Sequence, residues 1–246
     1  MSHLLHNGRF LTGDGIDAPI GWMRIEAARI VDVGCGAPES VSATRSLDLQ
    51  GRTVTAGFYD AHVHLTWIAL SMMGPDLANT ADVGELQETV GAWKGPGRGP
   101  ERAWVVGDGF DESTWDSRQL PTRHDLDALG GTRPILVKRV CGHVSVGNSI
   151  ALDELPDGEH TNRQTGRVAE NDLWALNDRL RPDAAAFYDI WPRVQERLHA
   201  NGITSVHDVA SLQMIEALKR RHSEGALQVR VTFSVPAANR VALQGW

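Results

Sequence analysis

The stretch that most constrains what this chain can fold into is a His-x-His pair that follows an apolar run. Residues 53–58 predict a buried strand, and His62 and His64 come shortly after it. Side chains two residues apart in an extended chain point to the same side, so both imidazoles can be directed at one point. A divalent-metal site requires such an arrangement. Two surface histidines on a loop are the alternative, but the apolar strand and Gly57 before the pair favour metal ligation.

Length, charge and cysteine content exclude several classes of protein. The chain has 246 residues, enough for one large domain or two small ones. A formal net charge of −7 without a long basic run argues against a nucleic-acid partner. The sequence has no run of about 18 apolar residues, so we expect no membrane partner. Cys35 and Cys141 form neither a disulfide framework nor a C-x-x-C metal pair, and without a leader pattern we expect a cytoplasmic protein.

Residues 1–52 predict a small sheet of short strands. Two apolar pairs flank residues 6–8, His-Asn-Gly, which predict a hairpin turn. Only about half of the residues in these strands are apolar, so the sheet would have one buried face and would need a partner. We therefore assign residues 1–52 to a partial β-domain and residues 53–246 to a second domain.

The second domain alternates strands and helices. Strands are expected over residues 53–58, 103–106, 134–140, 203–208 and 229–235, and helices over 83–93, from 121, over 187–198 and over 212–218. Pro192 predicts a late start or a kink in the third helix. Residues 95–100 predict a surface loop, and residues 144–182 predict irregular structure. This order indicates a parallel sheet, either an open doubly wound sheet or a (β/α) barrel, and polar residues at the strand ends favour the barrel.

Several blocks resemble the amidohydrolase superfamily. Residues 55–64, which read TAGFYDAHVH, resemble its first-strand signature, with Ala56 in place of a proline. Residues 106–112, 120–127, 133–143, 165–171 and 202–208 resemble one branch, which includes the N-substituted formamide deformylases. Order and spacing match over nearly the whole chain. Cys141 stands where that branch usually has aspartate before Gly-His.

The resemblance implies an α/β fold in which a (β/α)8 TIM-type barrel follows half of a small β-sandwich. The expected strands fill only part of such a barrel, so we expect an incomplete barrel over residues 53–246. The later strands of the family carry two further metal-binding histidines and a proton-accepting aspartate that nothing here matches. We therefore expect the isolated chain to be marginally stable, to self-associate and to lack hydrolase activity.

The resemblance also implies a third metal ligand. Glu170 matches the glutamate of a Gly-x-x-x-Glu block in the family, so it would join His62 and His64 at the metal. Lys138 is the rival, because related enzymes use a carboxylated lysine on a barrel strand. A lysine whose ammonium extends into solvent is the ordinary alternative.

Three polar residues near strand ends are candidates for roles in catalysis. His143 could hydrogen-bond the substrate or tie down a loop, and Asp111 could face the cleft or cap the next segment. We take both as catalytic candidates. His207 could also face the site, or could act as a helix N-cap beside Asp208.

The expected activity is hydrolysis of a non-peptide C–N bond, in a small-molecule amide or an N-substituted formamide. The divalent metal, expected to be zinc, would lower the pKa of bound water to about 7 and polarise the carbonyl. A carboxylate would carry the proton to the leaving amine. The alternatives are a heterocycle deaminase of the same superfamily and a truncated, non-catalytic chain that binds only metal or another chain. The self-association expected above could take the form of a homo-oligomer.

Overall fold

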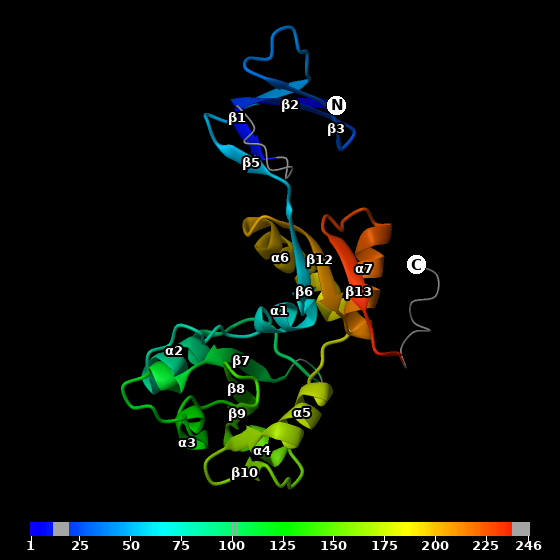
Figure 1. Ribbon diagram of the computed structural model, residues 1–246. Coiled ribbons are helices and arrows are strands. Elements are labelled where there is room, and N and C mark those ends of the chain that lie inside the picture. Colours follow the sequence, from blue (N-terminus) through cyan, green and yellow to red (C-terminus); the bar gives the residue numbers. More distant parts are fainter. Residues whose placement is uncertain (12–19, 100, 102, 238–246) are drawn as a thin grey trace. The chain divides into compact units, whose positions relative to one another are not determined.

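The computed structural model describes residues 1–11, 20–99, 101 and 103–237, and the chain divides into two compact units (Figure 1). The first unit is Met1–Phe58 and the second is Tyr59–Trp246. No helix in the described part of the chain is long and apolar enough to cross a membrane.

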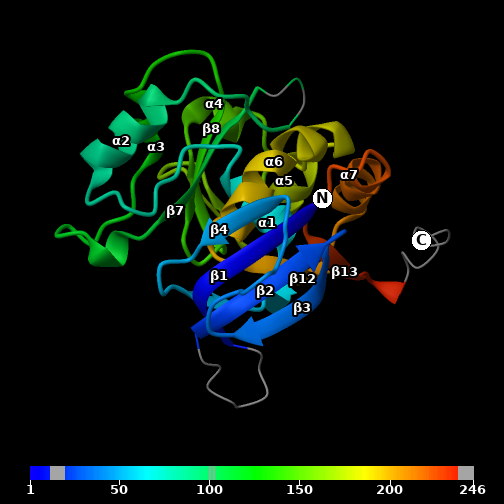
Figure 2. The ribbon, with the colours of Figure 1, turned by 90° about the horizontal axis from the view of Figure 1, so that it is seen from above.

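The first unit is one sheet. Its strands are β1 (Ser2–Leu11), β2 (Ile20–Glu26), β3 (Arg29–Cys35), β4 (Arg45–Asp48) and β5 (Thr53–Thr55). The order is β3-β2-β1-β4 (Figure 2). Strand β5 pairs with β1 further along the strand. Strands β2 and β3 run antiparallel to their neighbours, whereas β4 and β5 run parallel to β1.

The hairpin expected at residues 6–8 is wrong, because β1 continues through it. Asn7 has a φ of 55° and the register shifts between His6 and Gly8, so the sequence forms a bulge. Asparagine tolerates this left-handed conformation without reversing the chain. The hairpin lies instead between β2 and β3, where Ala27 and Ala28 have φ values of 48° and 62°.

The single strand expected over residues 53–58 is also wrong. Residues Thr53–Thr55 form β5 in the first sheet, and a separate strand, β6 (Phe58–Val63), begins after Gly57. The break at Ala56 and Gly57 therefore separates two sheets. It places His62 inside a strand and His64 directly after it.

The second unit contains two sheets (Figure 1). One has the order β13-β12-β6, with β12 (Ile203–Val209) parallel to β13 (Arg230–Ser234). The other has the order β10-β11-β9-β8-β7. Its strands are β7 (Val105–Phe110), β8 (Ile135–Arg139), β9 (Val144–Gly147), β10 (Thr161–Asn162) and β11 (Arg167–Ala169). These sheets are open, and the strands of the described residues form no closed barrel.

The expectation of irregular structure over residues 144–182 is wrong. Strands β9, β10 and β11 lie there and pair antiparallel with their neighbours, with only β7 and β8 parallel in this sheet. The reason is the short connection from β8 to β9, which turns at Gly142 with a φ of 74°. A parallel pairing would need a crossover of about a dozen residues.

Helices cover both faces of the five-stranded sheet. Alternate residues of β7 and β8 belong to two different apolar clusters. One cluster contains residues of α2 (Val83–Ala92) and α3 (Arg123–Asp127), and the other contains residues of α4 (Ser149–Asp153) and α5 (Glu170–Arg179). The expected starts of α2 and α3 are confirmed, because Asp82 accepts the backbone N–H of Glu85 at 2.8 Å and Thr122 forms a capping box with Asp125.

The three-stranded sheet packs against α1 (Leu65–Ser71), α6 (Ala184–Ala200) and α7 (Leu212–Ser223), of which α6 and α7 lie side by side (Figure 2). The late start expected from Pro192 is wrong, because α6 begins eight residues before it. Proline removes the N–H that would bond the carbonyl of Tyr188. The guanidinium of Arg221 on α7 donates to that oxygen at 2.8 Å instead.

Candidate functional site

The site begins with the two histidines at the end of β6. The ring centroids of His62 and His64 lie 5.2 Å apart, edge to face, and the intervening Val63 is buried in the core. The backbone N–H of His62 donates to the Asp60 carboxylate at 3.1 Å. Among the described residues, the ring nitrogens of the two histidines have no hydrogen-bond partner. The strand thus brings two imidazoles together with their nitrogens available to a ligand.

His64 connects this pair to a cavity of about 770 Å³. Its ring stacks on Trp67, with centroids 4.6 Å apart, and Trp67 lines the cavity. The remaining walls come from α1, α5 and the segments at the carboxyl ends of β7, β8, β12 and β13. Of the polar residues expected at the strand ends, Asp108 and His143 line the cavity. The others do not: His62, His64, Asp111, His207 and Asp208.

A buried ionic cluster forms one side of this cavity. Arg98 donates to the Asp108 carboxylate and to the carbonyl of Leu70, and the Lys138 Nζ lies 3.6 Å from the other oxygen of Asp108. Burial lowers the pKa of the Lys138 ammonium, and Asp108 opposes this shift. The alternative in which Lys138 extends into solvent is wrong, because its side chain is only 15% exposed. The loop over residues 95–100 is likewise not wholly on the surface, because Arg98 within it is buried.

His143 lines the same cavity and contacts Glu170, which does not line it. The Nδ1 of His143 lies 3.4 Å from Glu170 Oε2, and the backbone N–H of Glu170 donates to the carbonyl of His143 at 3.2 Å. Both side chains are exposed, and the His143 ring approaches the edge of Trp174. Glu170 has a φ of 45°, an uncommon conformation for a residue with a Cβ.

Asp111 and His207 occupy local structural positions. The Asp111 carboxylate accepts hydrogen bonds from the backbone N–H and hydroxyl of Ser113 and from Arg139, and Asp111 does not line the cavity. The Nε2 of His207 lies 2.7 Å from the Ser234 hydroxyl. The N-cap role considered for His207 is wrong, because Ser211 caps α7.

Asp208 was not chosen from the sequence as a site residue, yet it is fully buried beside the start of α1. One carboxylate oxygen accepts the backbone N–H of Leu65 at 2.8 Å, and the other has no partner within the described structure. Burial raises the pKa of the Asp208 carboxyl to about 6. An acidic residue inside an apolar strand was the sequence signal for this group.

His62 and His64 can supply two imidazole ligands to a metal, but no third ligand among the described residues joins them. Where residues are described, no three His, Cys, Asp or Glu side chains form a group that could hold a metal ion. The structure therefore brings His62 to His64 and His143 to Glu170, but it does not join the two pairs. Metal ligation by Glu170 stays a prediction.

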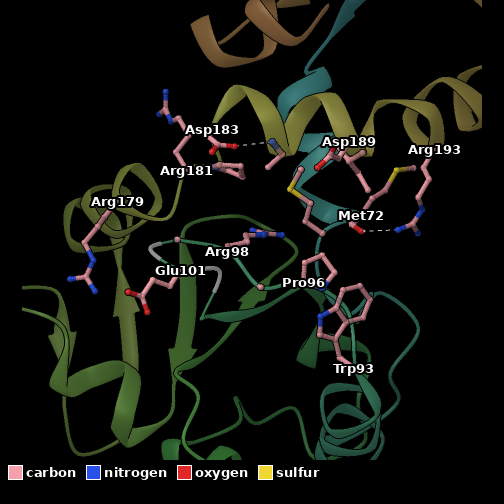
Figure 3. A pocket seen from close by; sticks show the side chains of 16 residues that line it. Met72, Trp93, Pro96, Arg98, Glu101, Arg179, Arg181, Asp183, Asp189 and Arg193 are labelled. Atoms are coloured by element: carbon pink, nitrogen blue, oxygen red, sulfur yellow. Dashed lines mark hydrogen bonds between the residues drawn. The ribbon is translucent and has the colours of Figure 1, made fainter. Parts of the chain in front are cut away.

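A second cavity of about 520 Å³ lies next to the first (Figure 3). It has apolar side chains such as Met72 and Trp93 and charged side chains such as Arg193 and Glu101. Arg98 and Arg181 line both cavities. The first cavity is lined by Asp108 and His143 at the strand ends and is therefore the candidate functional site.

Comparison with known proteins identifies the family. Residues 45–246, more than half of the chain, match the amidohydrolase family. This chain belongs to the amidohydrolase family. The resemblance noted in the sequence is confirmed.

Curated relatives match over part of their length. The chain is 29% identical over 214 residues to the N-substituted formamide deformylase of Arthrobacter pascens, covering 79% of this chain and 39% of that protein. It is 30% identical over 137 residues to the putative amidohydrolase YtcJ of Bacillus subtilis, covering 56% of this chain and 25% of that protein.

Solved structures of two uncharacterised metal-dependent hydrolases share the fold. The protein from Pyrococcus horikoshii has a TM-score of 0.74 and 25% identity, over 96% of this chain and 48% of its own. The protein from Pyrococcus furiosus has a TM-score of 0.74 and 24% identity, over 99% and 52%. The chain thus spans about half the length of these structures.

Proposed function

We propose that this amidohydrolase chain contributes to a metal-dependent hydrolase acting on a non-peptide C–N bond, in an amide or an N-substituted formamide. The observation that carries the proposal is the His62–His64 pair, whose ring nitrogens are available to a ligand. The His64 ring also stacks on Trp67, a residue that lines the cavity. The printed activity of the Arthrobacter pascens relative supports the choice of substrate class.

We propose zinc as the metal, with His62 and His64 holding it and Glu170 completing the ligand set. Imidazole and carboxylate donors suit zinc. When bound, such a metal supplies an activated water and polarises the substrate carbonyl. We also propose that the strands of the second unit form part of a (β/α)8 barrel. The cavity lies at the carboxyl ends of these strands, which is where such barrels carry their active sites.

The chain's own residues would then orient the substrate. Glu170 lies against Nδ1 of His143, and this contact favours the tautomer with the proton on Nδ1. Nε2 of His143 would then accept a proton or hydrogen bond from the substrate or the leaving amine. Trp67 and Trp174 supply apolar walls against which the substituent of an amide can pack. Asp111 would act indirectly, by holding Arg139 at the rim.

The test measures amine release from an N-substituted formamide in the presence of zinc. The chain would be assayed alone and joined to the segment that follows the aligned part of the Arthrobacter pascens deformylase. The chain alone is expected to be inactive, and zinc-dependent release by the joined form, lost when His62 and His64 are both changed to alanine, is the expected result. Absence of turnover in both forms would contradict the proposal and favour a non-catalytic chain.

A further inference from the structure

The cavity of the candidate site faces more positive than negative charge. Its lining residues include four cations, Arg98, Lys138, Arg139 and Arg181, and one carboxylate, Asp108. Two of these cations are neutralised by carboxylates outside the lining. Arg139 pairs with Asp111 and Glu112, and Arg181 pairs with Asp178.

The other two cations share one carboxylate. Arg98 donates to one oxygen of Asp108, while Lys138 lies 3.6 Å from the second oxygen. The side chains of Arg98, Lys138 and Asp108 are 3%, 15% and 22% exposed. Where residues are described, these two cations therefore share a single carboxylate and together carry one net positive charge, which costs free energy in a buried site unless an anion binds.

Lys138 is the member of this group that can receive an anion. Arg98 is already engaged with Asp108 and with the carbonyl of Leu70 on α1, and it stands between the two cavities, as Figure 3 shows for one of them. The ammonium of Lys138 carries three N–H groups, and within the described residues the Asp108 carboxylate is its one acceptor. Its position among the lining residues leaves the remaining donors available to a ligand.

We propose that the cavity takes amide substrates that carry a carboxylate, and that Lys138 is the specificity-determining residue that binds it. A single net positive charge matches a monoanion in charge. Apolar lining residues, including Trp67, Leu70 and Leu180, fit the organic body of such a substrate better than a hydrated inorganic ion. The inference rests on the proposed function for its substrate class.

The test measures binding and needs no turnover. Protein stripped of metal on a chelating resin is titrated calorimetrically with N-formylglycine and with its neutral analogue N-formylglycinamide. We expect the carboxylate to bind about tenfold tighter, the change produced by one modest charge-assisted contact. Lys138→Met should remove this preference, and Lys138→Arg should retain it because the charge is kept.

A matched control is Lys94→Met, which removes an exposed lysine that contacts only the carbonyl of Gly91. This variant should keep the preference of the parent. Equal affinities for the two compounds in the parent, binding of neither, or an unchanged preference in folded Lys138→Met would each overturn the inference.

Carboxylation of Lys138 would also overturn the inference, because it makes the side chain negative. It would give a carbamate carbon signal with ¹³C-bicarbonate that Lys138→Met lacks. A carboxylate preference without any amidase activity would sustain the inference and count against the proposed activity alone.

Discussion

His64 is the residue that links the proposed metal to the cavity, because its ring stacks on Trp67 while it neighbours His62. We expect the double change His62→Ala and His64→Ala to abolish zinc uptake, because a lone carboxylate holds zinc poorly in water. Elemental analysis after dialysis against zinc measures this. His199→Ala, at the end of α6, is the control and should leave zinc content unchanged. Equal zinc contents in the double variant and the parent would refute the assignment.

The third ligand is tested in the same assay. Glu170→Gln should weaken zinc binding and leave the protein folded, because its side chain is exposed and, among the described residues, has His143 as its one polar partner. If zinc affinity is unaltered, Lys138 becomes the candidate.

Asp208 predicts an unusual pH dependence of stability. Its folded-state pKa, raised to about 6, exceeds that of an unfolded aspartate, so the folded protein binds more protons between about pH 4 and 6. Stability contributed by this group is therefore present below about pH 4 and is lost as the pH rises to about 6. The unfolding free energy lost over this pH range is on the order of 3 kcal/mol, at about 1.4 kcal/mol for each unit by which the pKa is raised.

The variant Asp208→Asn should remove this dependence, because asparagine keeps an oxygen for the Leu65 N–H and does not ionise in this range. Urea unfolding at pH 4, 5, 6 and 7 measures it. The stability of the variant relative to the parent should rise with pH and level off above pH 6. Parallel pH profiles would show that the carboxyl is not buried as described.

At the scale of elements, α7 supplies a hydrogen bond that α6 lacks because of Pro192. Arg221 satisfies the Tyr188 carbonyl that proline leaves without an N–H, and its guanidinium also lies 3.8 Å from the centroid of the Tyr188 ring. We expect Arg221→Met to cost about 1 kcal/mol of unfolding free energy, the low end of the range for an unsatisfied acceptor, because this hydrogen bond is only part-buried. The cost should be smaller in a Pro192→Ala background, because alanine restores the missing N–H.

A double-mutant cycle measured by chemical unfolding reports this coupling. Additive costs of the two changes would mean that the guanidinium does not substitute for the helical hydrogen bond.

Elements with strong local signals were predictable from the sequence. The start of α2 at Asp82 and the capping box of α3 follow from side chains that bond their own backbone. Strands β10 and β11 have two and three residues, too short to give a periodic pattern, and they are fixed by the pairing of β11 with β9 and of β10 with β11. The turn predicted at Asn7 was wrong because asparagine and glycine occur in β-bulges as well as in turns.

The site was predictable only where it is local. His62 and His64 are two residues apart, so strand geometry brings their rings together. The meeting of His143 with Glu170, 27 residues later, depends on the β8–β9 hairpin and on the pairing of β11 with β9. Arg98 stands in a glycine- and proline-rich loop, where nothing in the sequence indicates burial against Asp108.

At the scale of the whole molecule, open sheet edges carry apolar side chains. Strand β3 is at one edge of the first sheet, and Ile30, Val31 and Val33 on it are exposed. Such an edge offers unpaired backbone groups to another chain. We expect the chain to self-associate, with an apparent mass by light scattering that rises with protein concentration.

Changing Val31 and Val33 to lysine should reduce this association, because charged side chains block edge pairing. Asp32→Lys alters the net charge by the same amount and leaves the valines in place, so it is the matched control. A monodisperse monomer at every concentration would contradict the prediction.

The candidate site draws its parts from two sheets that share no hydrogen-bonded ladder in the part of the chain that the structure describes. The histidine pair belongs to the sheet of β6, β12 and β13, whereas Asp108, Lys138 and His143 belong to β7, β8 and the turn that follows. A change of register in one sheet therefore need not disturb the other. His62 and His64 on one sheet and Lys138 on the other can therefore accumulate substitutions separately, so a new substrate preference can evolve at Lys138 without altering the histidine pair. Glu170 and His143 lie beside the five-stranded sheet and are the groups that such changes would have to preserve.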